Sequence, residues 1–389
     1  MCYTASTFMG KKLHKMKIPK EDNEMEILNF IKEHGDNWRE IIRQKPYAIK
    51  VTTDGEYTIL KYDQINSDLS LPLVKECRGL ILDNQNRPVC VPFFKFFNSF
   101  EPNADNIDWN SARVQEKLDG SIIKLAYFGG EWRVSTNGTI DAYKSKIYED
   151  LSDIECPYTT YGELWDIAKK KTNLDYDKLD KNCTYMFELV GPYNKVVVDY
   201  KETKIYHIGT RDNTTLQELD IDIGVEKPKV YPLSTLQGCL DACKDMPFNQ
   251  EGYVVVDKDW HRVKIKSPAY VAVHRLKNNG DINERAVIEL IRENELDEFL
   301  SYFPEFKKVI YEYKSILEKM VEDLTTNIKE ISKKTYETQK DFALEVKDKF
   351  NSGFYFMWKK DNTLTPEAWL WNHDNTKLKE MIERWKNQN

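Results

Sequence analysis

The spacing of hydrophobic residues changes near residue 275 of this 389-residue chain, and the change divides the chain into two kinds of structure. Before that point, short runs alternate apolar with polar side chains, as a strand with one buried face does. The run Tyr47–Asp63 alternates in this way and carries Asp54-Gly55 at its middle, a dipeptide typical of a tight hairpin turn. We therefore predict that residues 1–275 form an α+β domain of antiparallel sheets with flanking helices.

Beyond residue 275 the apolar side chains recur at helical spacing instead. Glu284–Phe303 and Phe306–Ile331 each place them three or four residues apart, and Pro304 separates the two segments. A short aromatic run at Phe354 is the one strand-like stretch of this part of the sequence. Residues 276–389 are therefore predicted to form an all-α domain.

Smaller elements of the first domain are predicted from periodicity and from turn residues. Two strands between Val114 and Val134 flank Gly129-Gly130, so Lys117 is expected at a strand end or in a short loop that enters a strand. The other predicted elements are helices over residues 21–44, 161–171 and 233–244, strands over residues 184–190, 195–200 and 204–212, and a hairpin over residues 251–267.

Composition favours soluble globular domains, because 31% of the residues are charged and 41% are hydrophobic. No apolar run approaches the roughly 20 residues that a membrane helix needs. The N-terminus lacks the apolar block of a signal peptide. We therefore expect a cytoplasmic protein that is monomeric and does not bind membranes.

Charge and cysteine content narrow the possible ligands. The formal net charge of -7 argues against binding nucleic acid over the whole surface, but it permits a local basic groove. The seven cysteines are scattered, and although Cys239 and Cys243 are close, no second pair or histidine cluster completes a zinc site. A structural metal is therefore not expected, and the ligands of any functional metal stay unassigned.

The segment VQEKLDGS, residues 114–121, contains a lysine followed by Asp-Gly. As an isolated pattern it would usually be a solvated lysine beside a turn. For a nucleophile the side chain must lose its proton, and a free lysine, with a pKa of about 10.4, does so in only about one molecule in a thousand at neutral pH. Burial or neighbouring cations would lower the pKa of Lys117, and Gly120 would allow the backbone to approach a ligand closely.

The segment VKIK can supply such cations. Lys264 and Lys266 are two residues apart, so in a strand both project from the same face. Two lysines directed into one pocket would repel each other and Lys117, and a bound triphosphate would relieve the repulsion. We therefore expect this strand to face Lys117.

Four further residues combine charge with apolar surroundings. Arg78 is either a surface arginine or a phosphate ligand, and Lys95 within FFKFFNSF either extends to solvent from an edge strand or pairs with a buried anion. Glu188 and Glu251 suit a ribose hydroxyl or a metal-bound water, but each can equally be a structural hydrogen-bonding group. Phe187 can stack on a purine or fill the core, and the core is favoured.

These motifs together resemble the covalent nucleotidyltransferases, which comprise ATP-dependent DNA and RNA ligases and mRNA capping enzymes. The matching motifs, in order along the chain, are KLDGS, FELVGP, EGYVVV and VKIKSP. Within this superfamily the chain is most similar to the RNA ligase 1 group typified by the bacteriophage T4 enzyme. That closer similarity rests on ECRGLIL and KFFNSFE before the lysine, on FELVGPYNKVVVDY, and on a helical C-terminal segment in place of a β-rich OB domain.

The resemblance covers about residues 45–275 and implies a nucleotidyltransferase (ATP-grasp-like ligase) fold that uses ATP and Mg²⁺, or Mn²⁺. It implies that Lys117 carries AMP and that RNA with 5′-phosphate and 3′-OH ends, such as a nicked tRNA in RNA repair, is the substrate. It also implies that the C-terminal helices position the RNA. The residues implied to contact the nucleotide are Tyr62, Arg78, Lys95, Glu116, Gly120, Glu188, Glu251, Lys264 and Lys266.

Two alternatives remain at this stage. A DNA ligase or a GTP-dependent capping guanylyltransferase would use the same lysine chemistry, although the sequence shows no OB-like segment after VKIK. A non-catalytic RNA-binding protein could keep the fold, but the presence of Lys117 and of both VKIK lysines disfavours it. The lysines assigned to the long C-terminal helix can also be a solvated face, because glutamates lie among them. These lysines are Lys307, Lys308, Lys314, Lys319, Lys329, Lys333 and Lys334.

Overall fold

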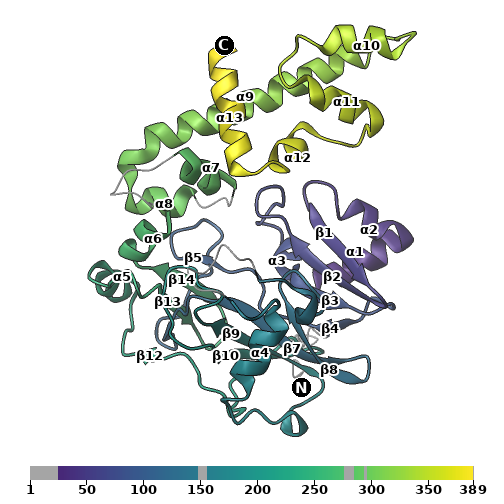
Figure 1. Cartoon of the computed structure of the whole chain (residues 1–389). Helices are drawn as coiled ribbons and strands as arrows, with labels where there is room; N and C mark the ends of the chain where they lie inside the picture. Colours follow the sequence, from purple (N-terminus) through teal and green to yellow (C-terminus); the bar gives the residue numbers. More distant parts are fainter. Residues whose placement is uncertain (1–24, 148–155, 276–283, 293–295, 389) are drawn as a thin grey trace, which may run out of the picture.

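The computed structural model describes residues 25–147, 156–275, 284–292 and 296–388. Three β-sheets with flanking helices occupy the first part of the chain, and a group of helices forms the second part (Figure 1). The long helix α9 (Lys307–Ile331) runs across the helical part. Within these ranges no helix is long and apolar enough to cross a membrane. The predicted α+β architecture with a helical C-terminal region is confirmed.

The first sheet contains the predicted hairpin at Asp54-Gly55. Asp54 pairs with Tyr57, and Gly55 takes a φ of +61°, which suits a glycine in a tight turn. Three helices pack against this sheet, and together they bury residues such as Trp38 and Leu80. The elements are β1 (Ile49–Asp54), β2 (Tyr57–Tyr62), β3 (Arg78–Leu82) and β4 (Pro88–Cys90), with α1 (Glu26–His34), α2 (Trp38–Ile41) and α3 (Pro72–Glu76).

The second sheet provides the largest core of the first part. Its strands follow the order β11 (Glu218–Leu219), β10 (Lys204–Asp212), β9 (Cys183–Val190), β7 (Ser121–Phe128) and β8 (Glu131–Thr136). Helix α4 (Tyr161–Lys169) packs on this sheet and places Trp165 edge-on to Phe187, with ring centroids 4.9 Å apart. Phe187 is fully buried in that cluster, so it fills the core and is not a stacking surface for a purine.

The third sheet carries the lysine motifs. Its strands follow the order β12 (Val230–Tyr231), β6 (Arg113–Glu116), β13 (Gly252–Val256), β14 (Arg262–Lys266) and β5 (Phe97–Asn98). Helix α5 (Leu236–Lys244) covers it, with Cys239 and Cys243 buried beneath. Strand β6 ends immediately before Lys117, which confirms the predicted position of this residue at a strand end.

The C-terminal part is helical, and its core reaches back into the first part. The apolar face of α9 buries residues such as Ile310, Met320 and Leu324, and Val198 and Tyr270 join the same hydrophobic cluster. The predicted boundary near residue 275 falls at the end of α6. The remaining helices are α6 (Pro268–Arg275), α7 (Glu284–Arg292), α8 (Leu296–Tyr302), α10 (Gln339–Val346), α11 (Ser352–Lys360), α12 (Pro366–Trp371) and α13 (Asn375–Gln388).

Three sequence predictions of secondary structure were wrong or incomplete. The strand predicted over residues 195–200 is irregular backbone, because the N–H groups of Val197 and Val198 donate to the carboxylate of Asp119 instead of to a neighbouring strand. The aromatic run at Phe354 lies in helix α11. The helix predicted over residues 21–44 is two shorter helices, and its first residues, 21–24, lie outside the described ranges.

Candidate active site

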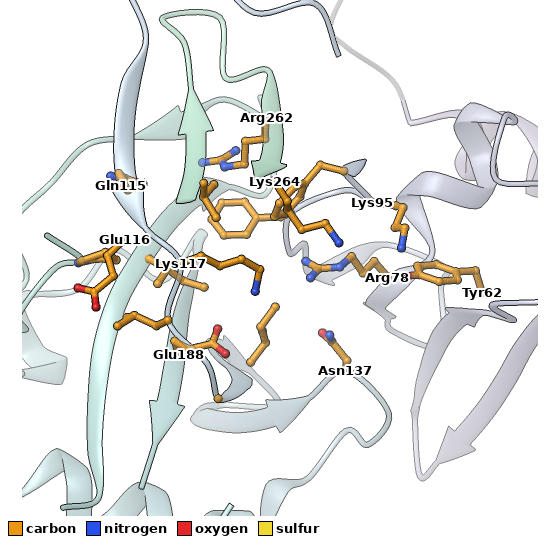
Figure 2. Close-up of a pocket in the computed structure, with 18 residues that line it drawn as sticks. Tyr62, Arg78, Lys95, Gln115, Glu116, Lys117, Asn137, Glu188, Arg262 and Lys264 are labelled. Atoms are coloured by element: carbon orange, nitrogen blue, oxygen red, sulfur yellow. The ribbon is translucent and has the colours of Figure 1, made fainter. Parts of the chain in front are cut away.

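A pocket of about 330 Å³ lies where the three sheets meet (Figure 2). Strands β2 and β3 supply one wall, β7 and β9 supply a second, and β6, β13 and β14 supply a third. Most of the residues predicted for the site line this pocket. They are Tyr62, Arg78, Lys95, Glu116, Lys117, Gly120, Glu188 and Lys264.

The backbone around Lys117 is held by two glycines. The N–H of Lys117 donates to the carbonyl oxygen of Gly252 at 2.9 Å, which ties the end of β6 to the start of β13. Gly252 takes a φ of +138°, and a Cβ there would lie 2.1 Å from the carbonyl oxygen of Ile265. A Cβ on Gly120 would lie 2.3 Å from the carbonyl oxygen of Leu189. The glycines therefore let the segment around Lys117 pack closely against two neighbouring strands.

The side chain of Asp119 fixes the position of the segment that carries Lys117. Its carboxylate accepts hydrogen bonds from the backbone N–H of Val197 at 2.9 Å, from that of Val198 at 2.7 Å and from the Tyr270 hydroxyl at 2.8 Å. The side chain is almost fully buried and does not line the pocket. The aspartate of the KLDGS motif is thus a structural acceptor, a role that the sequence prediction did not give it.

An acidic group adjoins Lys117. The Nζ of Lys117 lies 2.7 Å from Oε1 of Glu251, in an ion pair whose carboxylate is buried. Burial raises the pKa of Glu251, although Lys117 and Lys266 act in the opposite direction. The nearest charged group to the Lys117 amine is therefore a carboxylate, whereas the sequence led us to expect the two VKIK lysines. Glu251 itself does not line the pocket.

Glu188 on β9 faces the pocket directly beneath Lys117 (Figure 2). Burial raises the pKa of Glu188 to about 8, and the nearby Lys117 and Arg78 only partly oppose this effect, while Glu251 reinforces it. A buried carboxylate, that of Glu251, and a half-buried one, that of Glu188, thus lie near one ammonium group. Oxygen ligands of this kind are the ones that divalent cations such as Mg²⁺ prefer, so Glu188 and Glu251 fit a role beside such an ion.

The opposite side of the pocket is basic and aromatic. The guanidinium of Arg78 lies 5.5 Å from the Phe96 ring centroid, and its Nη1 is buried without a hydrogen-bond partner among the described residues. The Nζ of Lys95 lies 5.3 Å from the Tyr62 ring centroid, and that of Lys264 lies 5.9 Å from Phe96. These aromatic rings hold three cations toward one cavity, which suits a polyanionic ligand.

Of the two VKIK lysines, only Lys264 lines the pocket. Lys266 pairs across the hairpin with Gly252 and lies close enough to Glu251 to oppose the rise that burial causes in the pKa of Glu251. Both lysines lie on β14, two residues apart, so their side chains share one face of the strand, as predicted. The strand, however, extends beyond the end of the pocket, so the two lysines have different neighbours.

Several pocket residues were missed by the sequence prediction. Asn137 follows β8, and its Oδ1 is buried without a hydrogen-bond partner among the described residues. Arg262 lines the pocket and binds Glu218 through two hydrogen bonds of 2.7 and 2.5 Å. Gln115 and Phe96 adjoin predicted residues in the sequence, and that proximity was the available signal for them. Asn137 had none, because only the folding of β8 onto β7 brings it to the pocket.

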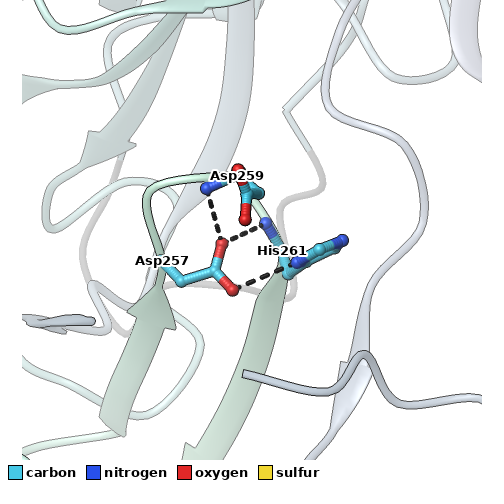
Figure 3. A group of neighbouring side chains, drawn as sticks. All are labelled: Asp257, Asp259 and His261. Atoms are coloured by element: carbon cyan, nitrogen blue, oxygen red, sulfur yellow. Dashed lines mark hydrogen bonds and ion pairs between the residues drawn. The ribbon is translucent and has the colours of Figure 1, made fainter. Parts of the chain in front are cut away.

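Asp257, Asp259 and His261 form a separate cluster at the turn between β13 and β14, with ligand atoms within 4.8 Å of one another (Figure 3). Oδ1 of Asp257 accepts from the backbone N–H groups of Asp259 and His261, at 2.9 and 3.0 Å. Its Oδ2 accepts from the backbone N–H of Asp108 and contacts Nδ1 of His261. Because three backbone N–H groups and the His261 ring already contact this carboxylate, the cluster organises the hairpin.

A sequence model of a protein family, described as RNA ligase, matches residues 76–270. The chain is 29% identical over 300 residues to a protein of Autographa californica nuclear polyhedrosis virus whose provisional name is bifunctional polynucleotide kinase/RNA ligase. It is 27% identical over 356 residues to the RNA ligase of Rhodothermus phage RM378. Each alignment covers 72% of this chain, but only 42% of the baculovirus protein and 80% of the phage protein.

Solved structures give weaker matches. An archaeal ATP-dependent RNA ligase aligns over 83% of this chain and 89% of its own, at 15% identity and a TM-score of 0.42. A Naegleria gruberi RNA ligase with ATP and Mn aligns over 42% of this chain and 51% of its own, at 17% identity and a TM-score of 0.30. Both TM-scores are below 0.5, a level at which a common arrangement of the whole chain is not established.

Proposed function

This chain belongs to the RNA ligase family of the bacteriophage T4 RNA ligase 1 type, and we propose that it is an ATP-dependent enzyme that joins RNA ends through AMP bound to Lys117. The observation that carries the proposal is the position of Lys117. Its amine enters a pocket that has carboxylates on one side and three cations on the other. A nucleophile in that position would face a bound triphosphate, whose negative charge the three cations would balance.

In the first step, the lone pair of Lys117 Nζ attacks the α-phosphorus of ATP. The P–O bond to the β-phosphate breaks, and pyrophosphate leaves. The attacking amine must first give up a proton, and Glu251, 2.7 Å away with a pKa raised by burial, is placed to accept it. The product is a lysine–AMP phosphoramidate.

Arg78, Lys95 and Lys264 are assigned to the phosphates of ATP. Arg78 Nη1 is a buried donor without a hydrogen-bond partner among the described residues, so a phosphate oxygen would satisfy it. A divalent cation, Mg²⁺ or Mn²⁺, held near Glu188 and Glu251 would offset the charge on the α-phosphate oxygens. Tyr62, Glu116 and Gly120 complete the predicted nucleotide pocket, together with Gln115, which was not predicted.

The second and third steps use the RNA ends. An RNA 5′-phosphate oxygen attacks the phosphorus of lysyl-AMP, which frees the lysine and gives 5′-adenylated RNA. A 3′-OH then attacks the 5′-phosphate and AMP leaves, so a phosphodiester bond forms. The two RNA ends must be held together for the last step, and the C-terminal helices are proposed to do this for a broken tRNA.

The lysines of α9 support that role, with one correction. Lys307, Lys308, Lys319 and Lys329 are exposed on the helix, where RNA phosphates can reach them. The sequence prediction also placed Lys333 and Lys334 on this helix. Both lie beyond its last residue, Ile331, and Lys334 pairs with Glu345 at 2.8 Å. Fewer lysines are therefore available on α9 than predicted.

The proposed chemistry is tested by incubating the protein with α-³²P-labelled ATP and Mg²⁺. The wild-type protein should acquire label that acid releases and alkali does not, as expected for a P–N bond. Lys117→Ala should acquire none, and Lys178→Ala, which removes an exposed lysine that does not line the pocket, should label normally. Covalent label on Lys117→Ala would refute the assignment.

Substrate comparisons separate the alternatives. Label from GTP in place of ATP would indicate a capping-type reaction, and joining of nicked duplex DNA in preference to single-stranded RNA would indicate a DNA ligase. Residues 284–292 and 296–388 contain helices but no strand. This disfavours a β-rich OB domain over the described part of the C-terminal region.

A further inference from the structure

Lys124 is a fully buried lysine that lies outside the predicted active site. It lies on β7, and its side chain points to the same face of the strand as Ala126 and Phe128, which pack toward the first sheet. Its neighbours Ile123 and Leu125 point to the opposite face and belong to the core beneath α4. The ammonium group is thus placed between two sheets, an environment in which a lysine is rarely found.

The ammonium group of Lys124 makes one hydrogen bond among the described residues, to the carbonyl oxygen of Gly79. Burial lowers the pKa of Lys124 to about 8, and the nearby Arg78 and Lys61 act in the same direction. A buried cation with a single neutral acceptor is expensive. An apolar side chain would fill the same space with a smaller free-energy cost of burial. The presence of a lysine therefore indicates that its hydrogen bond to Gly79 has a specific role.

Gly79 is closely packed between Lys124 and the backbone of Asn137. Its φ is +83°, and the register of β2 and β3 shifts at this point, so Gly79 bulges out between the paired residues Arg78 and Leu80. A Cβ on Gly79 would lie 2.8 Å from Lys124 Nζ and 3.0 Å from both the Cα and the carbonyl oxygen of Asn137. The start of β3, the middle of β7 and the loop after β8 therefore meet at one peptide.

Two pocket residues flank this junction. Arg78 immediately precedes Gly79, and the backbone of Asn137 packs against it. Both side chains line the pocket, where Arg78 Nη1 and Asn137 Oδ1 are buried without hydrogen-bond partners among the described residues. A shift of the Gly79 peptide would move both groups relative to a bound nucleotide. Figure 2 shows them on adjacent sides of the pocket, opposite Lys117.

We propose that Lys124 is a positioning residue, which holds the Gly79 peptide so that Arg78 and Asn137 face the phosphates of ATP. This inference rests on the proposed function of the pocket. The bond to the Gly79 carbonyl fixes the bulge of β3 against β7, and the bulge sets the direction of the Arg78 side chain. Lys124 thus acts on the ligand through its neighbours and does not itself line the pocket.

The test compares Lys124→Met with the wild-type protein in self-adenylylation, with ATP concentration varied. Met keeps the volume and the unbranched stem but cannot donate to Gly79. We expect the KM for ATP to rise roughly tenfold, as the loss of a charge-assisted hydrogen bond would produce. Ile81→Ala is the matched control, because Ile81 is buried on β3 in the cluster between the same two sheets. It should lower the Tm without changing the KM.

A double-mutant cycle separates positioning from general destabilisation. If Lys124 acts through Arg78, Lys124→Met should add little to the effect of Arg78→Ala on the KM. Additive effects, or a folded Lys124→Met protein with the wild-type KM, would overturn the inference. Should Lys124→Met not fold, Lys124→Leu, which is also apolar and cannot donate to Gly79, supplies the same measurement. Wild-type protein that acquires no label would instead refute the proposed function, so the two failures are distinguishable.

Discussion

The Nζ of Lys117 and Oε1 of Glu251 lie 2.7 Å apart, although Lys117 follows β6, Glu251 precedes β13 and the two residues are far apart in the sequence. The pairing follows from the register of β6 with β13, in which Tyr253 faces Glu116 and the N–H of Lys117 bonds to Gly252. It places a proton acceptor beside the proposed nucleophile.

Glu251→Gln is therefore expected to slow self-adenylylation by roughly 100-fold, a typical loss when a general base is removed. The wild-type rate should fall at low pH as Glu251 takes up a proton, and burial raises the pKa at which this occurs. The variant should lack that acidic limb. Single-turnover labelling between pH 5 and 9 measures both effects. Glu116→Gln, on the pocket rim, is the control and should keep the acidic limb.

Glu188 should make the stability of the ligand-free protein depend on pH. Its pKa is raised from 4.5 to about 8 in the folded protein, so the folded state binds more protons than the unfolded state between these values. The free energy of unfolding therefore decreases as the pH rises through this window. Glu188→Gln removes this contribution and should be more stable than wild type at pH 8.5, by roughly 1–3 kcal/mol, with a smaller difference at pH 5.

Urea unfolding at the two pH values measures this difference. The same variant should lose self-adenylylation, because an amide cannot replace the carboxylate beside the reacting phosphate. A Glu188→Gln protein whose stability changes with pH as the wild type's does would show that Glu188 does not titrate in this window.

Asp119→Ala should destabilise the protein and release the segment that carries Lys117. The substitution leaves the N–H groups of Val197 and Val198 and the hydroxyl of Tyr270 without their acceptor, at a cost of roughly 2–5 kcal/mol. Chemical denaturation measures the loss. Asp108→Ala, whose carboxylate is partly exposed beside Lys258, should destabilise the protein much less. Equal losses in the two variants would contradict the anchoring role of Asp119.

Reversing three exposed charges on α9 should affect RNA joining and leave the first step intact. Lys307→Glu, Lys308→Glu and Lys319→Glu together should weaken binding of a nicked tRNA roughly tenfold or more, because phosphate contacts are lost. The dependence of binding on salt concentration should also become shallower. Self-adenylylation should equal that of wild type, and Lys178→Glu, in the first part of the chain, should change neither reaction. Unchanged tRNA joining would assign the RNA-positioning role elsewhere.

The sequence predicted most of the fold where local signals were strong. Asp54-Gly55 fixed a hairpin, and the spacing of Ile310, Met320 and Leu324 fixed a long helix, because turn geometry and helical periodicity depend on neighbouring residues alone. The prediction failed at residues 195–200, where three successive valines favour a strand. Their backbone N–H groups are instead bound by Asp119, a partner that no local pattern reveals.

The residues of the site likewise divide into those that sequence motifs predict and those whose partners only the tertiary structure reveals. The sequence by itself led to the prediction that Lys117, Arg78 and Lys264 act on phosphates, because their motifs, which resemble those of a known family, specify residue type, order and spacing. The tertiary structure alone decided that Glu251 pairs with Lys117, that Lys266 lies outside the pocket and that buried Lys124 holds Gly79 beside Arg78. Ion pairs and hydrogen bonds act over a few ångströms, so strand register and the packing of sheets select the partners of each charge.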